Sequence, residues 1–252
     1  MSVITTTQTA NSNSMSAAFV IAQVSIRDTF LTEGDSPAMP DTLYFVVDRS
    51  NDNTAFMVDY ATCDSTANTG TDYSNTTGTI SFALNDGILT DTIKIPVLTD
   101  DIVELDELLS VKLSNIVTVA PDTTIMGMDS IGIGQIIDND AAIVTIRDTT
   151  VLEGNAGTDT LKFVVTTDNV VDSLGLVFTT MDSTATAASN DYVSRTDTIF
   201  VSGLVDTIKI AVIGNDTVEL DEFIKVMITE IIPNGRNATL PDSIAVGTIT
   251  ND

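Results

Sequence analysis

The chain has 252 residues, of which 36 are acidic and 10 are basic, and it contains no histidine and no tryptophan. A formal net charge of −26 excludes nucleic acid as a partner, because phosphate binding requires clustered Lys and Arg side chains. The absence of histidine also excludes Ser-His-Asp and Cys-His catalysis and most zinc chemistry.

The composition is otherwise that of a folded protein. Hydrophobic residues make up 43% of the chain and charged residues 18%, which is typical of packed domains rather than of an acidic disordered tail. No segment reaches the roughly 18 apolar residues of a membrane span, so no membrane insertion is expected. Residues 1–19, rich in Thr, Ser and Asn, are expected to form an N-terminal arm that is flexible or donates a strand to a neighbour.

Residues 20–140 contain seven runs in which Val, Ile, Thr and Phe alternate with polar residues, separated by turn-forming residues. Strands are expected at 20–28, 42–48, 56–62, 78–82, 92–98, 108–116 and 131–137. In the fifth run, Ile93, Ile95 and Val97 alternate with Lys94 and Pro96. This alternation places three apolar side chains on the core face and Lys94 in water.

Residues 141–252 repeat this pattern. Strands are expected at 142–148, 160–166, 176–181, 197–201, 207–213, 223–231 and 244–250. The sequence Ile-Arg-Asp-Thr occurs at 26–29 and at 146–149, and Val-Glu-Leu-Asp-Glu occurs at 103–107 and at 218–222. Seven strands per copy predict an all-β fold of two tandem seven-stranded immunoglobulin-like antiparallel β-sandwiches, residues 20–140 and 141–252. The short connection at 138–141 predicts an elongated arrangement.

Acidic residues recur in the same order at the strand ends of both copies, where the loops at one end of a sandwich converge. Calcium takes six to eight oxygen ligands, and carboxylates supply them without nitrogen or sulfur. Two carboxylates about 4 Å apart repel by roughly 4 kcal/mol at an effective dielectric constant near 20, so a converged cluster favours a bound cation. From the net charge alone, a solvated acidic surface is an equal alternative.

Five features, in order and in duplicate, resemble the Calx-beta domain over residues 20–252. They are Glu-Gly at 33–34 and 153–154, Thr-x-Asp-x-Thr-Ala at 62–67 and 180–185, Asp-Tyr at 72–73 and 191–192, the Glu-x-Asp-Glu loops, and the Asp-rich end of each copy. The resemblance implies Ca²⁺ as the cofactor. It implies metal ligands in the first copy at Glu33, Asp72, Asp100, Asp101, Glu104, Glu107, Asp138 and Asp140. Asp64 and Asp182, inside the Thr-Ala runs, are expected to form turns.

The second copy departs from this pattern. Asn215 stands where the first copy has Asp100, and Asn251 aligns with Asp138. Because fewer charged ligands lower calcium affinity, a weaker or incomplete site is expected there. Its expected ligands are Glu153, Asp191, Asp216, Glu219, Glu222 and Asp252.

Three functions follow from these features. The first is a non-enzymatic calcium-binding structural or adhesion module of an extracellular, cell-surface protein or filament subunit. Its partners would be calcium ions and neighbouring repeats or subunits bound end to end, with a homopolymeric filament as one form. The second is a calcium-sensing regulatory tandem, as in sodium/calcium exchangers. The third, a glycan-active enzyme, requires an acid in an apolar pocket beside aromatic platforms, and only 5% of the residues are aromatic.

Overall fold

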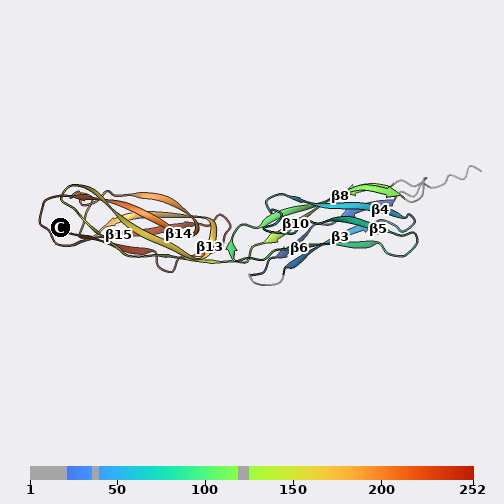
Figure 1. Cartoon of the computed structure of the whole chain (residues 1–252), viewed down its shortest axis with the longest axis horizontal. Coiled ribbons are helices and arrows are strands. Elements are labelled where there is room, and N and C mark those ends of the chain that lie inside the picture. The colour runs from blue at the N-terminus through green and yellow to red at the C-terminus, as the bar shows by residue number, and fades with distance from the viewer. Residues whose placement is uncertain (1–21, 36–39, 119–124) are drawn as a thin grey trace, which may run out of the picture.

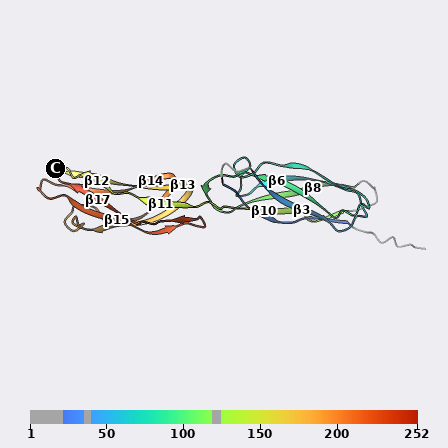
Figure 2. The same ribbon diagram turned by 90° about the horizontal axis from the view of Figure 1, so that it is seen from below.

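The computed structural model describes residues 22–35, 40–118 and 125–252, so the predicted arm at 1–19 lies outside the described residues. The described residues form strands and loops, and they include no helix that is long and apolar enough to cross a membrane. Two β-sandwiches lie end to end in an elongated molecule (Figures 1 and 2). The all-β, tandem immunoglobulin-like fold predicted from the sequence is confirmed. The predicted limits of the arm and of the two domains stay predictions.

The first sandwich consists of a four-stranded and a five-stranded sheet. The first sheet has the order β6 (Thr90–Val97), β3 (Asp41–Arg49), β1 (Ala22–Ile26) and β9 (Ile125–Asp129). The second has the order β2 (Thr29–Thr32), β10 (Ile131–Ile137), β8 (Glu107–Thr118), β4 (Phe56–Asp64) and β5 (Thr77–Phe82). Ile93, Ile95 and Val97 are buried and Lys94 is exposed, as the alternation predicts.

The second sandwich forms one continuous ladder with the order β12 (Thr149–Leu152), β17 (Ile244–Thr250), β15 (Glu222–Ile232), β13 (Gly157–Asp182), β11 (Ala142–Ile146) and β16 (Ala238–Thr239). Strand β14 (Thr196–Gly214) pairs with β13 along most of its length. The predicted separate strands at 160–166 and 176–181 are therefore one strand, β13, and those at 197–201 and 207–213 are one strand, β14. Register shifts between Thr166 and Val171, and between Val171 and Leu174, allow β13 to bend, so that its first half pairs with β11 and its second half with β15.

The two sandwiches are joined by main-chain pairing as well as by the chain itself. Strand β7 (Ile102–Val103), from a loop of the first sandwich, pairs in parallel with Val170 and Val171 of β13. Val103 is fully buried and belongs to the hydrophobic core of the second sandwich. Ile143 donates its backbone N–H to Asp168 at 2.6 Å, which fixes the start of β11 against the same part of β13.

Candidate metal centre

Acidic side chains of the first copy gather at the end of the first sandwich that faces the second. This end, here called the junction pole, consists of the loops at 33–35, 66–73, 98–107 and 138–140. Among the described residues, two groups of three acids have ligand oxygens within 4.8 Å of one another, and both groups lie at this pole. One contains Glu33, Asp138 and Asp140. The other contains Asp72, Glu104 and Glu107.

The first group is held by the ends of β2 and β10. The backbone N–H of Glu33 donates to the carbonyl of Ile137 at 3.0 Å, which sets the end of β2 beside the end of β10. Asp138 accepts the N–H of Asp140 at 3.2 Å and the N–H of Glu104 at 3.3 Å. Asp140 is only 7% exposed, and its Oδ2 is a buried side-chain oxygen for which the described part of the chain supplies no hydrogen-bond donor.

The second group combines the Asp-Tyr turn with the loop before β8. Asp72 accepts the N–H of Asn68 at 2.5 Å, and its carbonyl accepts the N–H of Leu98 at 2.9 Å. Glu107 is the first residue of β8, and Glu104 lies three residues before it in the loop that carries β7. The turn and the loop therefore place three partly buried carboxylates together.

Burial and mutual repulsion raise the pKa values of these acids. The pKa of Glu33 rises from 4.5 to about 8, first through burial and then through Asp100, Asp138, Asp140 and Glu104. Burial likewise raises the pKa of Glu104 to about 7. Burial away from water and neighbouring negative charge both disfavour the ionised form of a carboxylate, so these acids would need a bound cation to be ionised together.

Other acids of the pole show the same effect. The pKa of Glu107 rises to about 8, by burial and then by a hydrogen bond with Asp72. The pKa of Asp140 rises to about 6, mainly by burial and then by Asp138. Burial also raises the pKa of Asp138.

The remaining predicted ligands of the first copy surround the two groups. Asp100 accepts the N–H of Ile102 at 2.8 Å and raises the pKa of Glu33, while Asp101 lies exposed beside it and raises the pKa of Asp140. All eight predicted residues thus lie at the junction pole, and their role as ligands stays a prediction.

Two acids of the junction pole were not among the predicted ligands. Asp35 raises the pKa of Asp140 and accepts a hydrogen bond from the side-chain amide of Asn139 at 2.5 Å. Asp106 accepts the N–H of Asp138 at 3.3 Å and so positions that carboxylate. The Asp at the centre of Glu-x-Asp-Glu was the available signal for Asp106, whereas no repeated motif marks Asp35.

Two residues of the second sandwich also reach the junction pole. Arg236 donates from Nη2 to Asp172 at 2.6 Å and also bonds it through Nε. The acids Glu104 and Asp138 help to raise the pKa of Arg236, after its larger interaction with Asp172. The acidic site therefore faces an ion pair of the next sandwich.

The corresponding acids of the second copy lie at the opposite end of the second sandwich, here called the distal pole. It consists of the loops at 153–156, 183–192 and 215–221 and of residues 251–252. Glu153 is 7% exposed, and burial followed by Glu219, Asp252 and Asp191 raises its pKa. Burial, Asp191 and Glu219 also raise the pKa of Glu222, while Asp216 is exposed.

Asparagine amides occupy the key positions of this second cluster. Asn215, the counterpart of Asp100, donates its side-chain N–H to Glu153 at 2.7 Å. Asn251, the counterpart of Asp138, accepts the N–H of Glu219 at 3.0 Å, the same bond that Asp138 makes with Glu104. The amides keep the loop geometry but remove negative charge, and one of them satisfies the buried Glu153.

Two further repeated acids have structural roles. Asp64 accepts the N–H of Thr69 at 3.0 Å, and Asp182 accepts the N–H of Ala187 at 3.0 Å and the hydroxyl of Tyr192 at 2.6 Å. Tyr73 donates its hydroxyl to Asp64 in the same way. The prediction that these two acids form turns is confirmed.

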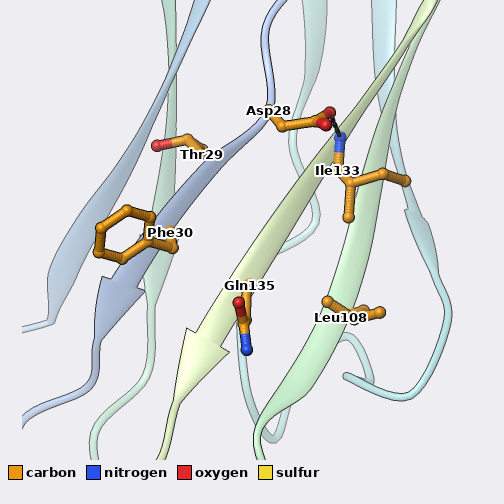
Figure 3. A pocket seen from close by; sticks show the side chains of 6 residues that line it. All are labelled: Asp28, Thr29, Phe30, Leu108, Ile133 and Gln135. Atoms are coloured by element: carbon orange, nitrogen blue, oxygen red, sulfur yellow. Dashed lines mark hydrogen bonds between the residues drawn. The ribbon is translucent and has the colours of Figure 1, made fainter.

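The Asp of the repeated Ile-Arg-Asp-Thr motif fastens two strands together. Asp28 accepts the N–H of Ile133 at 2.7 Å (Figure 3), and Asp148 accepts the N–H of Val246 at 2.7 Å. Figure 3 also shows the shallow pocket beside this bond, on the outer face of the β2–β10–β8 sheet, lined in part by Phe30. In both copies this carboxylate accepts a backbone hydrogen bond, so the repetition of this acid reflects the fold rather than metal binding.

The residues of the junction pole fit a calcium ion. The available ligand atoms are all carboxylate oxygens, which are the hard ligands that Ca²⁺ prefers for its six to eight contacts. A buried carboxylate oxygen such as Asp140 Oδ2, to which the described residues donate no hydrogen bond, lowers stability unless a cation binds it. Zinc would favour nitrogen or sulfur ligands. Fold and site together define a tandem immunoglobulin-like protein with a calcium-type acidic centre between its sandwiches.

The comparison with protein families agrees with this class. The Calx-beta domain model matches residues 38–135 and 137–252. The crystal structure of CBD12 from CALX1.2 is 19% identical, covering 89% of this chain and 99% of that chain, with a TM-score of 0.39. The apo-form Calx CBD1 domain is 24% identical, covering 48% of this chain and 100% of that chain, with a TM-score of 0.39. Among curated proteins, no relative of the chain was found.

The chain belongs to the Calx-beta family and contains two Calx-beta domains in tandem. Calx-beta domains are calcium-binding regulatory or binding modules, and the two acidic groups supply the carboxylates that such a site requires.

Proposed function

We propose that the chain is a non-enzymatic, calcium-binding structural module of an extracellular surface protein or filament. The observation that carries the proposal is the pair of acidic groups at the junction pole, with the buried Asp140 Oδ2 to which no described residue donates a hydrogen bond. Calcium would neutralise these acids and order the loops that contact the second sandwich. The chain has one cysteine, so a metal rather than an intrachain disulfide is the available means of cross-linking these loops.

The expected calcium affinity of the sites supports an extracellular setting. Extracellular calcium modules work at about 10⁻⁴–10⁻³ M, where even a site with few charged ligands is occupied. At the distal pole, Asn215 and Asn251 reduce the charge, so its calcium affinity should fall toward this range. A permanently loaded pair of sites would give a stiff rod suited to a surface structure.

The test is a calorimetric titration of the full chain with Ca²⁺, combined with thermal unfolding in calcium and in chelator. Asp138→Asn is the informative variant, because Asn251 shows that an amide at this position still accepts the loop N–H. We expect calcium affinity at the junction pole to fall at least about 10-fold through the lost charge. Asp216→Asn, which changes an exposed acid at the distal pole, is the matched control and should leave that affinity unchanged.

Equal melting temperatures in calcium and in chelator, with no heat of binding, would refute the calcium function. A calcium-sensing tandem is the second candidate, favoured by the approach of the Arg236–Asp172 pair to Glu104 and Asp138. The titration separates the two candidates. A sensor binds at about 10⁻⁷–10⁻⁵ M, whereas a structural module binds near millimolar calcium.

A further inference from the structure

The contact between the two sandwiches shows what the Val-Glu-Leu-Asp-Glu loop binds. In the first copy of this loop, Val103 is 0% exposed because it enters the core of the second sandwich. Its neighbour Leu105 lies against a turn of that sandwich, so close that a Cβ on Gly235 would be 2.9 Å from Leu105 Cδ2. The two apolar side chains of the loop are therefore docking residues for the next sandwich.

The second copy of the loop presents the same side chains to solvent. Val218 and Leu220, the counterparts of Val103 and Leu105, are 89% and 87% exposed. They are the most exposed large apolar side chains in the part of the chain that the structure describes. Neither supports the core of its own sandwich, so the distal pole presents the sequence counterpart of the internal docking element, whose two apolar side chains no described residue covers.

We propose that Val218 and Leu220 bind the free end of the first sandwich in a second copy of this chain, head to tail. The described part of that end, here called the free pole, consists of the loops at 50–55 and 83–89. The inference rests on the structural role proposed above and names the partner of that rod: another copy of the chain.

The free pole has an apolar surface that fits this partner. Leu84, Ile88 and Leu89 are 56%, 55% and 46% exposed in one loop between β5 and β6. The buried Arg49 holds this loop in place by donating to the carbonyls of Ile88 at 2.6 Å and Ala83 at 2.7 Å. The apolar side chains are thus presented by an ordered backbone, which lowers the entropy cost of binding.

The free pole has polar residues at positions where the second sandwich has apolar residues at the internal junction. Aligned on Asp64 and Asp182, Asp52 and Asn53 stand where the second sandwich has Val170 and Val171. The apolar contact must therefore come from the 83–89 loop, which hydrogen bonds to the 50–55 loop through Asn85 N–H and the carbonyl of Asp52 at 2.8 Å.

The positions of the two surfaces determine the kind of assembly. The free pole and the distal pole lie at opposite ends of the elongated molecule (Figures 1 and 2). A contact between different surfaces at opposite ends does not close on itself, so it produces linear oligomers rather than symmetric dimers. Because Glu219, Asp221 and Glu222 alternate with or follow the docking side chains in the sequence, calcium should strengthen the contact by reducing repulsion.

The experiment is sedimentation velocity of the full chain over a concentration series in millimolar Ca²⁺. The wild type should form a ladder of oligomers that grows with concentration. Val218→Ser with Leu220→Ser should lower the association constant by at least about 100-fold, since two anchors are lost. Ile88→Ser with Leu89→Ser, on the opposite surface, should do the same. Phe30→Ser, which changes a side chain that is 71% exposed on the side of the rod, is the matched control and should associate like the wild type.

Mixing the two double variants gives the sharpest result, because each keeps one intact surface. The mixture should form 1:1 dimers and nothing larger. A wild type that stays monomeric throughout the series, or double variants that still form the ladder, would overturn the inference. Calcium titration of the same samples distinguishes the two proposals: a chain that binds calcium but stays monomeric retains the proposed function and loses this one.

Discussion

The residue pair Val103 and Val218 offers a direct measurement of the junction between the sandwiches. Both occupy the first position of Val-Glu-Leu-Asp-Glu, so their local sequence is the same. One is fully buried in the core of the second sandwich and the other is 89% exposed. Val→Ala at each position makes the same chemical change in two opposite environments.

The expected magnitudes follow from the burial. Removing two methyl groups costs about 1.6 kcal/mol in lost burial, and the cavity left in a packed core brings the total for Val103→Ala to about 2–3 kcal/mol. For a domain of this size the melting temperature should fall by about 8–12 °C. Val218→Ala should change the free energy of unfolding by less than about 0.5 kcal/mol.

The assay is thermal and urea unfolding of the full chain at concentrations low enough to keep it monomeric. The loss in Val103→Ala should appear in the transition of the second sandwich, although the residue belongs to the first copy of the repeat. Equal effects of the two substitutions would refute the reasoning, because they would show that β7 is not packed into the second core in solution.

Three further predictions concern the stability of the two sandwiches. Arg49→Met should cost the first sandwich about 3–5 kcal/mol, since the buried guanidinium bonds three backbone carbonyls, whereas Arg27→Met, in an exposed ion pair, should leave the stability nearly unchanged; urea unfolding compares them. Gly214→Ala should destabilise the second sandwich by about 1–3 kcal/mol in the same assay, because the added Cβ would lie 2.2 Å from a backbone oxygen; a cost near zero would contradict that close approach. In chelator, the first sandwich should lose stability as the pH rises from 4.5 to about 8, because the folded-state pKa values of Glu33 and Glu107 are raised and the unfolded chain releases their protons first. Melting temperatures measured across this pH range should fall in chelator and not in calcium, which checks the direction of the predicted change in stability.

The strands and the acidic loops could be predicted from the sequence because their signals are local. Alternation around Lys94 identifies a half-buried strand, and acids at strand ends converge in any sandwich. The sequence could not show that β13 continues through residues 167–175. There Val170 and Val171 pair with β7 of the other sandwich, so the strand depends on a contact from outside its own repeat.

The same limit applies to the candidate site. The sequence indicates which positions of the second copy carry Asn in place of Asp, but not that the Asn215 amide turns toward Glu153 and satisfies it. Asp35 was missed because its contribution depends on the approach of a loop that is distant in the sequence. Local sequence likewise cannot distinguish the buried Val103 from the exposed Val218, because Val103 is buried only by its contact with the other sandwich.

The parallel pairing of the outer strands has a mechanical consequence. In the second sandwich the early strand β12 runs beside the final strand β17 in the same direction, and in the first sandwich β2 runs beside β10 in the same way. Tension applied between the two ends of the chain pulls the members of each pair in opposite directions along their length. Their hydrogen bonds are then loaded together in shear instead of opening one at a time. Each sandwich is therefore built to resist stretching along the axis of the rod.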